Sequence, residues 1–195
     1  AQELSRIGEL GGQLGIAVQN LPEFIATVST LATTTNLTVD NAALGLARLD
    51  AIAQTNGETF SNLASTIVDL GNNFAATESE IMTTVLRIAQ AAAQVGATTQ
   101  DALAFATALQ AIGVPAQAGG TAVARLFQEI QRAIQNGGEQ LYLFAAIADT
   151  TSEEFVKSFG EDSSMAVIDF IEGLSSAEER VNGLQDTLQK QEVGL

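Results

Sequence analysis

Residues 77–96 read TESEIMTTVLRIAQAAAQVG, and apolar side chains recur within them at steps of three and four residues. Ile81, Val85 and Ile88 therefore fall on one face of a helix, because a helix turns once every 3.6 residues. Thr77 precedes this stripe and a glycine follows it, and these residue types respectively start and end helices. The stretch predicts one amphipathic helix bounded at both ends.

The same spacing recurs along the chain, whereas sustained alternation of apolar and polar residues, the pattern of half-buried strands, is absent. Proline, which breaks helices, occurs only at Pro22 and Pro115. The expected fold class is therefore all-α, a compact array of short to medium helices. The expected helices cover residues 3–19, 22–35, 39–56, 58–71, 78–95, 99–113, 116–136, 139–148, 152–159, 163–173 and 176–191.

Hydroxyl side chains precede five of these helices at the N-cap position, where an oxygen accepts a hydrogen bond from a free backbone N–H. In four cases a carboxylate follows three positions later, which is the capping-box pattern of reciprocal side-chain and backbone bonds. Each cap contributes about 1 kcal/mol to helix stability. The predicted caps are Thr38, Thr77, Thr98, Thr151 and Ser175, followed three residues on by Asn41, Glu80, Asp101, Glu154 and Glu178.

Glycines are predicted in two roles. One group is expected to end helices, since glycine adopts a left-handed backbone at little cost. That group is Gly57, Gly71, Gly96, Gly113, Gly137 and Gly173. A second group is spaced by four residues near the N-terminus, which lets helices approach closely and marks dimerisation faces in membranes. This second group, which predicts a close-packing face with a membrane face as the alternative, is Gly8, Gly11, Gly12 and Gly15.

Composition divides the chain into three segments. Residues 1–35 form a glycine-spaced helical segment, residues 36–136 an Ala/Thr-rich helical core, and residues 137–195 an acidic helical segment. Three apolar residues near the end share one narrow helix face, which predicts a coiled-coil continuation. They are Val181, Leu184 and Leu188.

The chain carries 23 acidic and 8 basic residues, a formal charge of −15, and no His, Cys or Trp. These absences exclude disulfides, thiol nucleophiles, Cys/His zinc sites and any catalytic triad that needs an imidazole. The acidic balance argues against specific nucleic acid binding, because clustered Lys and Arg hold a phosphate backbone. It favours a basic partner or a surface to which DNA does not adhere.

The sequence contains no phosphate-binding loop, dinucleotide fingerprint, HExxH motif or calcium-loop spacing. Two pairs of adjacent acids, Glu153 with Glu154 and Glu161 with Asp162, are candidates for an acid–base centre of glycoside hydrolysis. Adjacent helical residues point to different faces, which favours solvated helix surface instead. We therefore expect no enzyme activity, no catalytic residue, no cofactor and no metal site.

A series of short motifs continues through most of the chain. They are NGETFSNLA (56–64), IVDLGN (67–72), ATESEI (76–81), AQVGAT (93–98), DALA (101–104), ALQAIG (108–113), ARLF (124–127), ADTTSEEF (148–155) and AVIDFIEGL (166–174). In their order and spacing, these motifs resemble the helical core domain of tailed-phage tape measure proteins. The resemblance covers roughly residues 38–175.

The resemblance implies a structural virion protein that sets tail length, occupies the tail tube and tip, and is released during DNA ejection. It implies tail tube, distal tail and hub proteins as partners, tail assembly chaperones in the host cytoplasm, and a homo-oligomer with a trimer favoured. It supplies no catalytic residues. A tail of ~1000 Å needs many hundreds of helical residues at about 1.5 Å each, so we expect the chain to be one segment of the ruler. The alternative is a membrane-active helical module that forms or assists a channel for genome delivery into the host.

Overall fold

The computed structural model describes residues 2–53 and 59–177, and these residues confirm the all-α class. They form α-helices and one 3₁₀ helix, with no strand among them. In chain order these are α1 (Gln2–Gln13), the 3₁₀ helix η1 (Val18–Asn20), α2 (Leu21–Thr34), α3 (Val39–Ala53), α4 (Phe60–Asn73), α5 (Glu78–Gln94), α6 (Thr99–Ala111), α7 (Ala116–Asn136), α8 (Gly138–Ile147) and α9 (Ser152–Glu161). A further helix, here called the 163–177 helix, begins at residue 163 and continues to residue 177.

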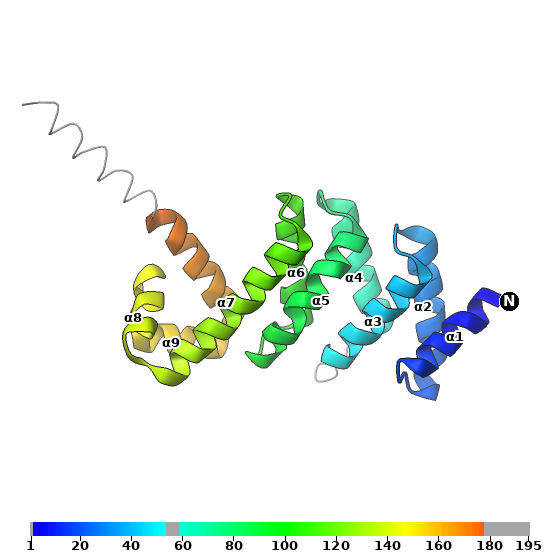
Figure 1. Cartoon of the computed structure of the whole chain (residues 1–195), viewed down its shortest axis with the longest axis horizontal. Helices are drawn as coiled ribbons and strands as arrows, with labels where there is room; N and C mark the ends of the chain where they lie inside the picture. Colours follow the sequence, from blue (N-terminus) through cyan, green and yellow to red (C-terminus); the bar gives the residue numbers. More distant parts are fainter. Residues whose placement is uncertain (1, 54–58, 178–195) are drawn as a thin grey trace, which may run out of the picture. The chain divides into compact units, whose positions relative to one another are not determined.

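The chain divides into two compact units, residues 1–125 and residues 126–195, and the division falls within α7. In the first unit, α1, α3 and α5 form one row, and α2, α4 and α6 form a second (Figure 1). From α1 to α6, each helix packs against the one before or after it along the chain and against its neighbour in the same row. The first unit is therefore a two-layered stack of helical hairpins. The segment boundaries predicted from composition, after residues 35 and 136, stay predictions.

A period of 39 residues runs through these hairpins. The N-cap positions of α2, α4, α6 and α8 each lie 39 residues after the previous one, at Asn20, Thr59, Thr98 and Gly137. Two sets of core positions follow the same period, and every side chain in them is exposed by 1% or less. The sets are Val28, Ile67, Ala106 and Ala145, and Leu49, Ile88, Phe127 and Ala166. In the first unit this period accompanies a stack of repeated helical hairpins, as in solenoid proteins.

Reciprocal capping boxes start three helices. At α5, Thr77 Oγ1 accepts the Glu80 N–H at 3.4 Å, and Glu80 Oε2 accepts the Thr77 N–H at 3.0 Å. The same reciprocal pairs are Thr98 with Asp101 at α6 and Thr151 with Glu154 at α9. Because each box satisfies two backbone donors that a helix leaves free, it fixes where each helix begins.

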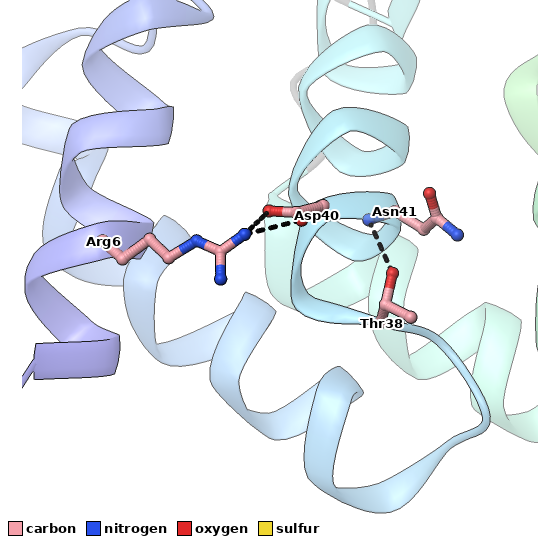
Figure 2. A network of polar contacts seen from close by, with 4 residues as sticks. All are labelled: Arg6, Thr38, Asp40 and Asn41. Carbon is pink, nitrogen blue, oxygen red and sulfur yellow. Dashed lines mark hydrogen bonds and ion pairs between the residues drawn. The ribbon is translucent and has the colours of Figure 1, made fainter.

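The start of α3 is held by two interactions (Figure 2). Thr38 Oγ1 accepts the Asn41 N–H at 3.2 Å, a cap without the reciprocal bond. Arg6 Nη2, on α1, donates to Asp40 Oδ1 at 2.8 Å and to Oδ2 at 2.7 Å. Both side chains of this ion pair are more than half exposed, so it contributes at most about 1 kcal/mol. Its contribution is mainly to the position of α1 against α3.

The prediction that Ser175 caps a new helix is wrong. Ser175 lies inside the 163–177 helix, so the expected break between two helices near residue 174 is absent. The cap of this helix is Asp162, whose Oδ1 accepts the N–H groups of Ser164 at 3.1 Å and Met165 at 3.0 Å. Ser175 matches the capping pattern, but the helix runs from residue 163 through residue 177, so Ser175 occupies an interior position of the helix and not an N-cap.

Two glycines that were expected to end helices lie within them instead. Gly71 is inside α4, where a Cβ would stand 2.6 Å from Glu78 Oε1. Gly173 is inside the 163–177 helix, where a Cβ would collide with the backbone carbonyl of Ile147. A glycine inside a helix costs only about 1 kcal/mol relative to alanine. Where a neighbouring group leaves no room for a Cβ, a glycine can therefore lie inside a helix instead of ending it.

The helix expected over residues 3–19 is also shorter than predicted, because α1 ends at Gln13. Gly15 adopts a φ of 83°, and the Ile16 N–H donates to the Gly11 carbonyl at 3.0 Å, as in a glycine-terminated helix. Three predicted helix-ending glycines do adopt a positive φ: Gly96, Gly113 and Gly137. Three predictions fall on residues outside the described part of the chain: the helix end at Gly57, the helix over 176–191 beyond residue 177, and the seam of Val181, Leu184 and Leu188.

Phenylalanine rings form the centre of the second unit. Phe144 of α8 stacks against Phe155 of α9, with ring centroids 6.4 Å apart, and lies 5.0 Å from the Phe170 ring of the 163–177 helix. Phe155 is exposed by only 1% and Phe170 by 6%. These contacts bring three helices of the second unit around one apolar centre.

Replacing Gly173 by alanine tests the close contact with α8. We expect Gly173→Ala to lower the free energy of unfolding by about 1–3 kcal/mol, because its methyl group overlaps the Ile147 carbonyl. The matched control is Gly160→Ala in α9, where a Cβ meets nothing within 4 Å. That control should be neutral or stabilising by up to about 1 kcal/mol. Urea unfolding of both variants measures the difference, and equal effects would contradict the assigned contact.

The capping box at α5 makes a pH-dependent contribution to stability. Hydrogen bonds from the Thr77 side chain and backbone lower the pKa of Glu80 in the folded chain. The resulting stabilisation is complete above the unfolded-state pKa and is lost as the pH falls through the lower folded-state pKa. Glu80→Gln should therefore destabilise the protein more at pH 7 than at pH 3, by urea unfolding at both values. As a control, Glu139→Gln changes a first-turn acid of α8 whose N-cap has no side-chain bond, and at pH 7 it should destabilise the protein less than Glu80→Gln.

Candidate interaction surface

A groove of about 840 Å³, here called the α2–α4 groove, lies between these two helices of the first unit. Both helices line it at the same offsets, i, i+3, i+4, i+7, i+8 and i+11, so each contributes one continuous helix face. From α2 the lining residues are Glu23, Ala26, Thr27, Thr30, Leu31 and Thr34. From α4 they are Ser61, Ala64, Ser65, Val68, Asp69 and Asn72. Small side chains therefore form most of the groove wall.

Three hydroxyl groups of the α2–α4 groove donate hydrogen bonds to their own helices. Thr30 Oγ1 donates to the Ala26 carbonyl at 2.9 Å, and Thr34 Oγ1 to the Thr30 carbonyl at 2.8 Å. On α4, Ser65 Oγ donates to the Ser61 carbonyl at 2.8 Å. Such back-bonding satisfies the hydroxyl donor within the helix. The walls thus offer mainly methyl and methylene surface for packing.

The charge of the α2–α4 groove is negative. Glu23 and Asp69 lie on its two walls, and none of its lining residues is basic. Glu23 Oε1 also accepts the Ser61 N–H at 3.3 Å, so its carboxylate lies at the start of α4. Burial, with a smaller effect of the Glu23 charge, raises the pKa of Asp50 on the neighbouring α3. The groove therefore presents one carboxylate on each wall, Glu23 from α2 and Asp69 from α4.

A second hollow, of about 580 Å³, lies in the second unit between the end of α8 and the 163–177 helix. Its lining includes three carboxylates, Asp149, Asp169 and Glu172. Asp149 is a non-glycine residue with a φ of 57°, at the turn after α8. Within residues 2–53 and 59–177, however, no three acidic side chains are grouped to hold a metal ion. This hollow offers acidic surface without a ligand arrangement.

The N-terminal glycines separate into two pairs with different surroundings. A Cβ on Gly11 would stand 3.0 Å from Phe24 Cδ1, and one on Gly8 would stand 3.3 Å from another side chain of α2. A Cβ on Gly12 or Gly15 would meet nothing within 4 Å. The close-packing face therefore consists of Gly8 and Gly11, and it allows α1 to approach α2. No helix in the described part of the chain is both long and apolar enough to cross a membrane.

Most of the predicted caps and acidic pairs lie at helix starts or on exposed helix surface. Thr38, Thr77, Thr98 and Thr151 lie at the starts of helices, as described above. Of the acids weighed for catalysis, Glu154 belongs to the α9 capping box, where hydrogen bonds from Thr151 and Thr150 lower its pKa. Asp162 caps the 163–177 helix, and Glu161 lies 3.9 Å from Lys157 in an exposed pair. The structure does not bring these acids together around a shared cleft.

Sequence reasoning missed two helix caps and the α2–α4 groove. Thr59 caps α4 by accepting the Asn62 N–H at 3.2 Å, and Asp162 caps the 163–177 helix. The signal for Thr59 was available, because it precedes Thr98 by one 39-residue period. The α2–α4 groove had no such signal, since small residues on a helix face also occur at buried contacts and on solvated surfaces.

Comparison with known proteins yields one family. The model of the family described as "Phage-related minor tail protein" matches residues 1–194. No curated protein and no solved structure matches the chain.

Proposed function

Because the chain belongs to the family of phage-related minor tail proteins, we propose that it is a segment of a tape measure protein. The family makes it a structural component of the phage tail and hence of the virion. In the proposed role, the segment occupies the lumen of the tail near the tip, helps to set tail length, and leaves during DNA ejection. The observation that carries the proposal is the family match over residues 1–194, joined to the motif order that resembles tape measure proteins.

The repeated hairpins support a length-setting role. Solenoid repeats contact mainly their neighbours, so their number can change without a new core. One 39-residue period, drawn out as a single helix, is about 60 Å long at about 1.5 Å per residue. A chain built from such units gains or loses length in discrete steps, which suits a molecular ruler.

We further propose that the segment forms a homo-oligomer, with a trimer favoured, and contacts tail tube, distal tail and hub proteins. Exposed apolar side chains of the second unit support such contacts. Tyr142 and Leu143 of α8 are exposed by 64% and 52%, and Ile171 and Leu174 of the 163–177 helix by 43% and 45%. Before incorporation, tail assembly chaperones in the host cytoplasm would cover these surfaces.

Removing one repeat from the gene in the intact phage tests the ruler role. Deleting residues 60–98 removes one period and joins the Thr59 cap to the next equivalent helix. We expect tails shortened by about 60 Å, the length of 39 helical residues, in electron micrographs of purified particles. Duplicating the same residues should lengthen tails by a similar amount.

A same-length control separates a ruler from a part that is merely needed for assembly. Residues 60–98 are replaced by a second copy of residues 99–137, which preserves the number of residues and the period. Tail length should then stay normal. Tails of normal length in the deletion phage would contradict the tape-measure assignment, although a structural role in the tail would stand.

A further inference from the structure

We propose that the α2–α4 groove is the docking site for an α-helix of a partner protein. The contacting face of that helix carries small side chains and two basic residues about two turns apart. The proposal rests on the groove alone and goes beyond the tape-measure role, so either can fail without the other.

The shape of the α2–α4 groove fits a helix. Its two walls are parallel rows of side chains at the spacing of one helix face, as ridges that receive a third helix would be. The opposite side of the same helix pair is already occupied, because both α2 and α4 pack against α3. A strand has no edge to pair with here, since the backbone bonds of α2 and α4 are used within the helices. A docked helix would thus add a third neighbour to the α2–α4 pair.

The small lining residues indicate which side chains the partner helix carries on its contacting face. The floor of the α2–α4 groove is formed by buried Thr27, Leu31 and Ala64, exposed by 8%, 1% and 8%. The wall hydroxyls of Thr30 and Ser65 are bonded to their own helices. An approaching helix therefore meets a shallow apolar trough, and alanine, glycine or serine on its face allows the closest approach.

The two carboxylates of the α2–α4 groove indicate which charged residues the partner helix carries. Glu23 is the third residue of α2 and Asp69 the tenth of α4, so they lie seven residues, or about 10 Å, apart along the groove. Lys or Arg seven positions apart on one helix face matches this spacing. A second copy of this chain, at a charge of −15, is a poorer match than a basic helix.

The test uses the full chain and a designed helical peptide. The probe is an 18-residue peptide rich in alanine, with two lysines seven positions apart on its alanine face and a fluorescent label. We expect saturable binding by fluorescence anisotropy. A peptide with glutamate in place of both lysines, and one with leucine in place of the facing alanines, should bind at least about tenfold more weakly.

Variants of the protein locate the binding. Ser65→Phe fills the α2–α4 groove from an exposed position and should abolish binding, and Glu23→Gln with Asp69→Asn should weaken it by about tenfold or more. The matched control, Glu9→Gln with Glu139→Gln, removes the same charge outside the groove and should retain binding. Circular dichroism checks that every variant keeps its helix content.

Three results would overturn the proposal. The first is no saturable binding of the lysine peptide up to about 1 mM. The second is equal loss of binding in the groove variants and in the control variant, which means general charge attraction. The third is self-association of the wild-type chain in sedimentation that Ser65→Phe abolishes, which means that a second copy occupies the groove.

Discussion

Stacking between hairpins is the constraint on which the first unit depends. A single pair of antiparallel helices leaves much of its apolar stripe open, and a neighbouring pair has to cover it. Ile88 of α5 shows this, since it is fully buried although its helix is only one of a pair. α5 packs against α3 and α4 of the preceding hairpin as well as against its partner α6. Folding of this unit is therefore a property of the stack, and the 39-residue period follows from repeating the same contact.

Side-chain size at the contacts then sets the spacing between helices. In the row of α1, α3 and α5, glycine allows close approach: Gly45 faces the Met82 side chain of α5, so that a Cβ there would overlap it. In the second row, the rings of Phe24 and Phe60 meet edge to face, with centroids 5.2 Å apart. Bulky rings near the starts of α2 and α4 and small residues farther along leave the α2–α4 groove between them. The groove is thus a consequence of residue size within an otherwise regular stack.

Sequence reasoning succeeds here where the signal is local. The helix stripes and the reciprocal pairs of Thr77 and Thr98 depend on residues three or four positions apart, and the structure contains both. It fails where a distant contact decides the outcome. Gly173 is a residue type that commonly ends helices, yet the helix continues through it. Its lack of a Cβ instead allows the Ile147 carbonyl of α8 to lie against it. The 39-residue period was present in the sequence, but it is carried by burial at equivalent positions whose residue types differ, such as Leu49 and Phe127.

The acidic charge of the chain has two different structural settings. Some carboxylates are bound by backbone N–H groups at helix starts, as with Glu80 and Asp162, where the helix dipole and hydrogen bonds stabilise the charge. Others lack such bonds, as with Asp50, whose pKa is raised by burial and, to a smaller extent, by the charge of Glu23. Hydrogen bonding at helix starts therefore accommodates part of the negative charge carried by the 23 acidic residues. Glu23 belongs to the first kind as well, since its Oε1 accepts the Ser61 N–H, and together with Asp69 it supplies the negative charge that the proposed basic helix would meet in the α2–α4 groove.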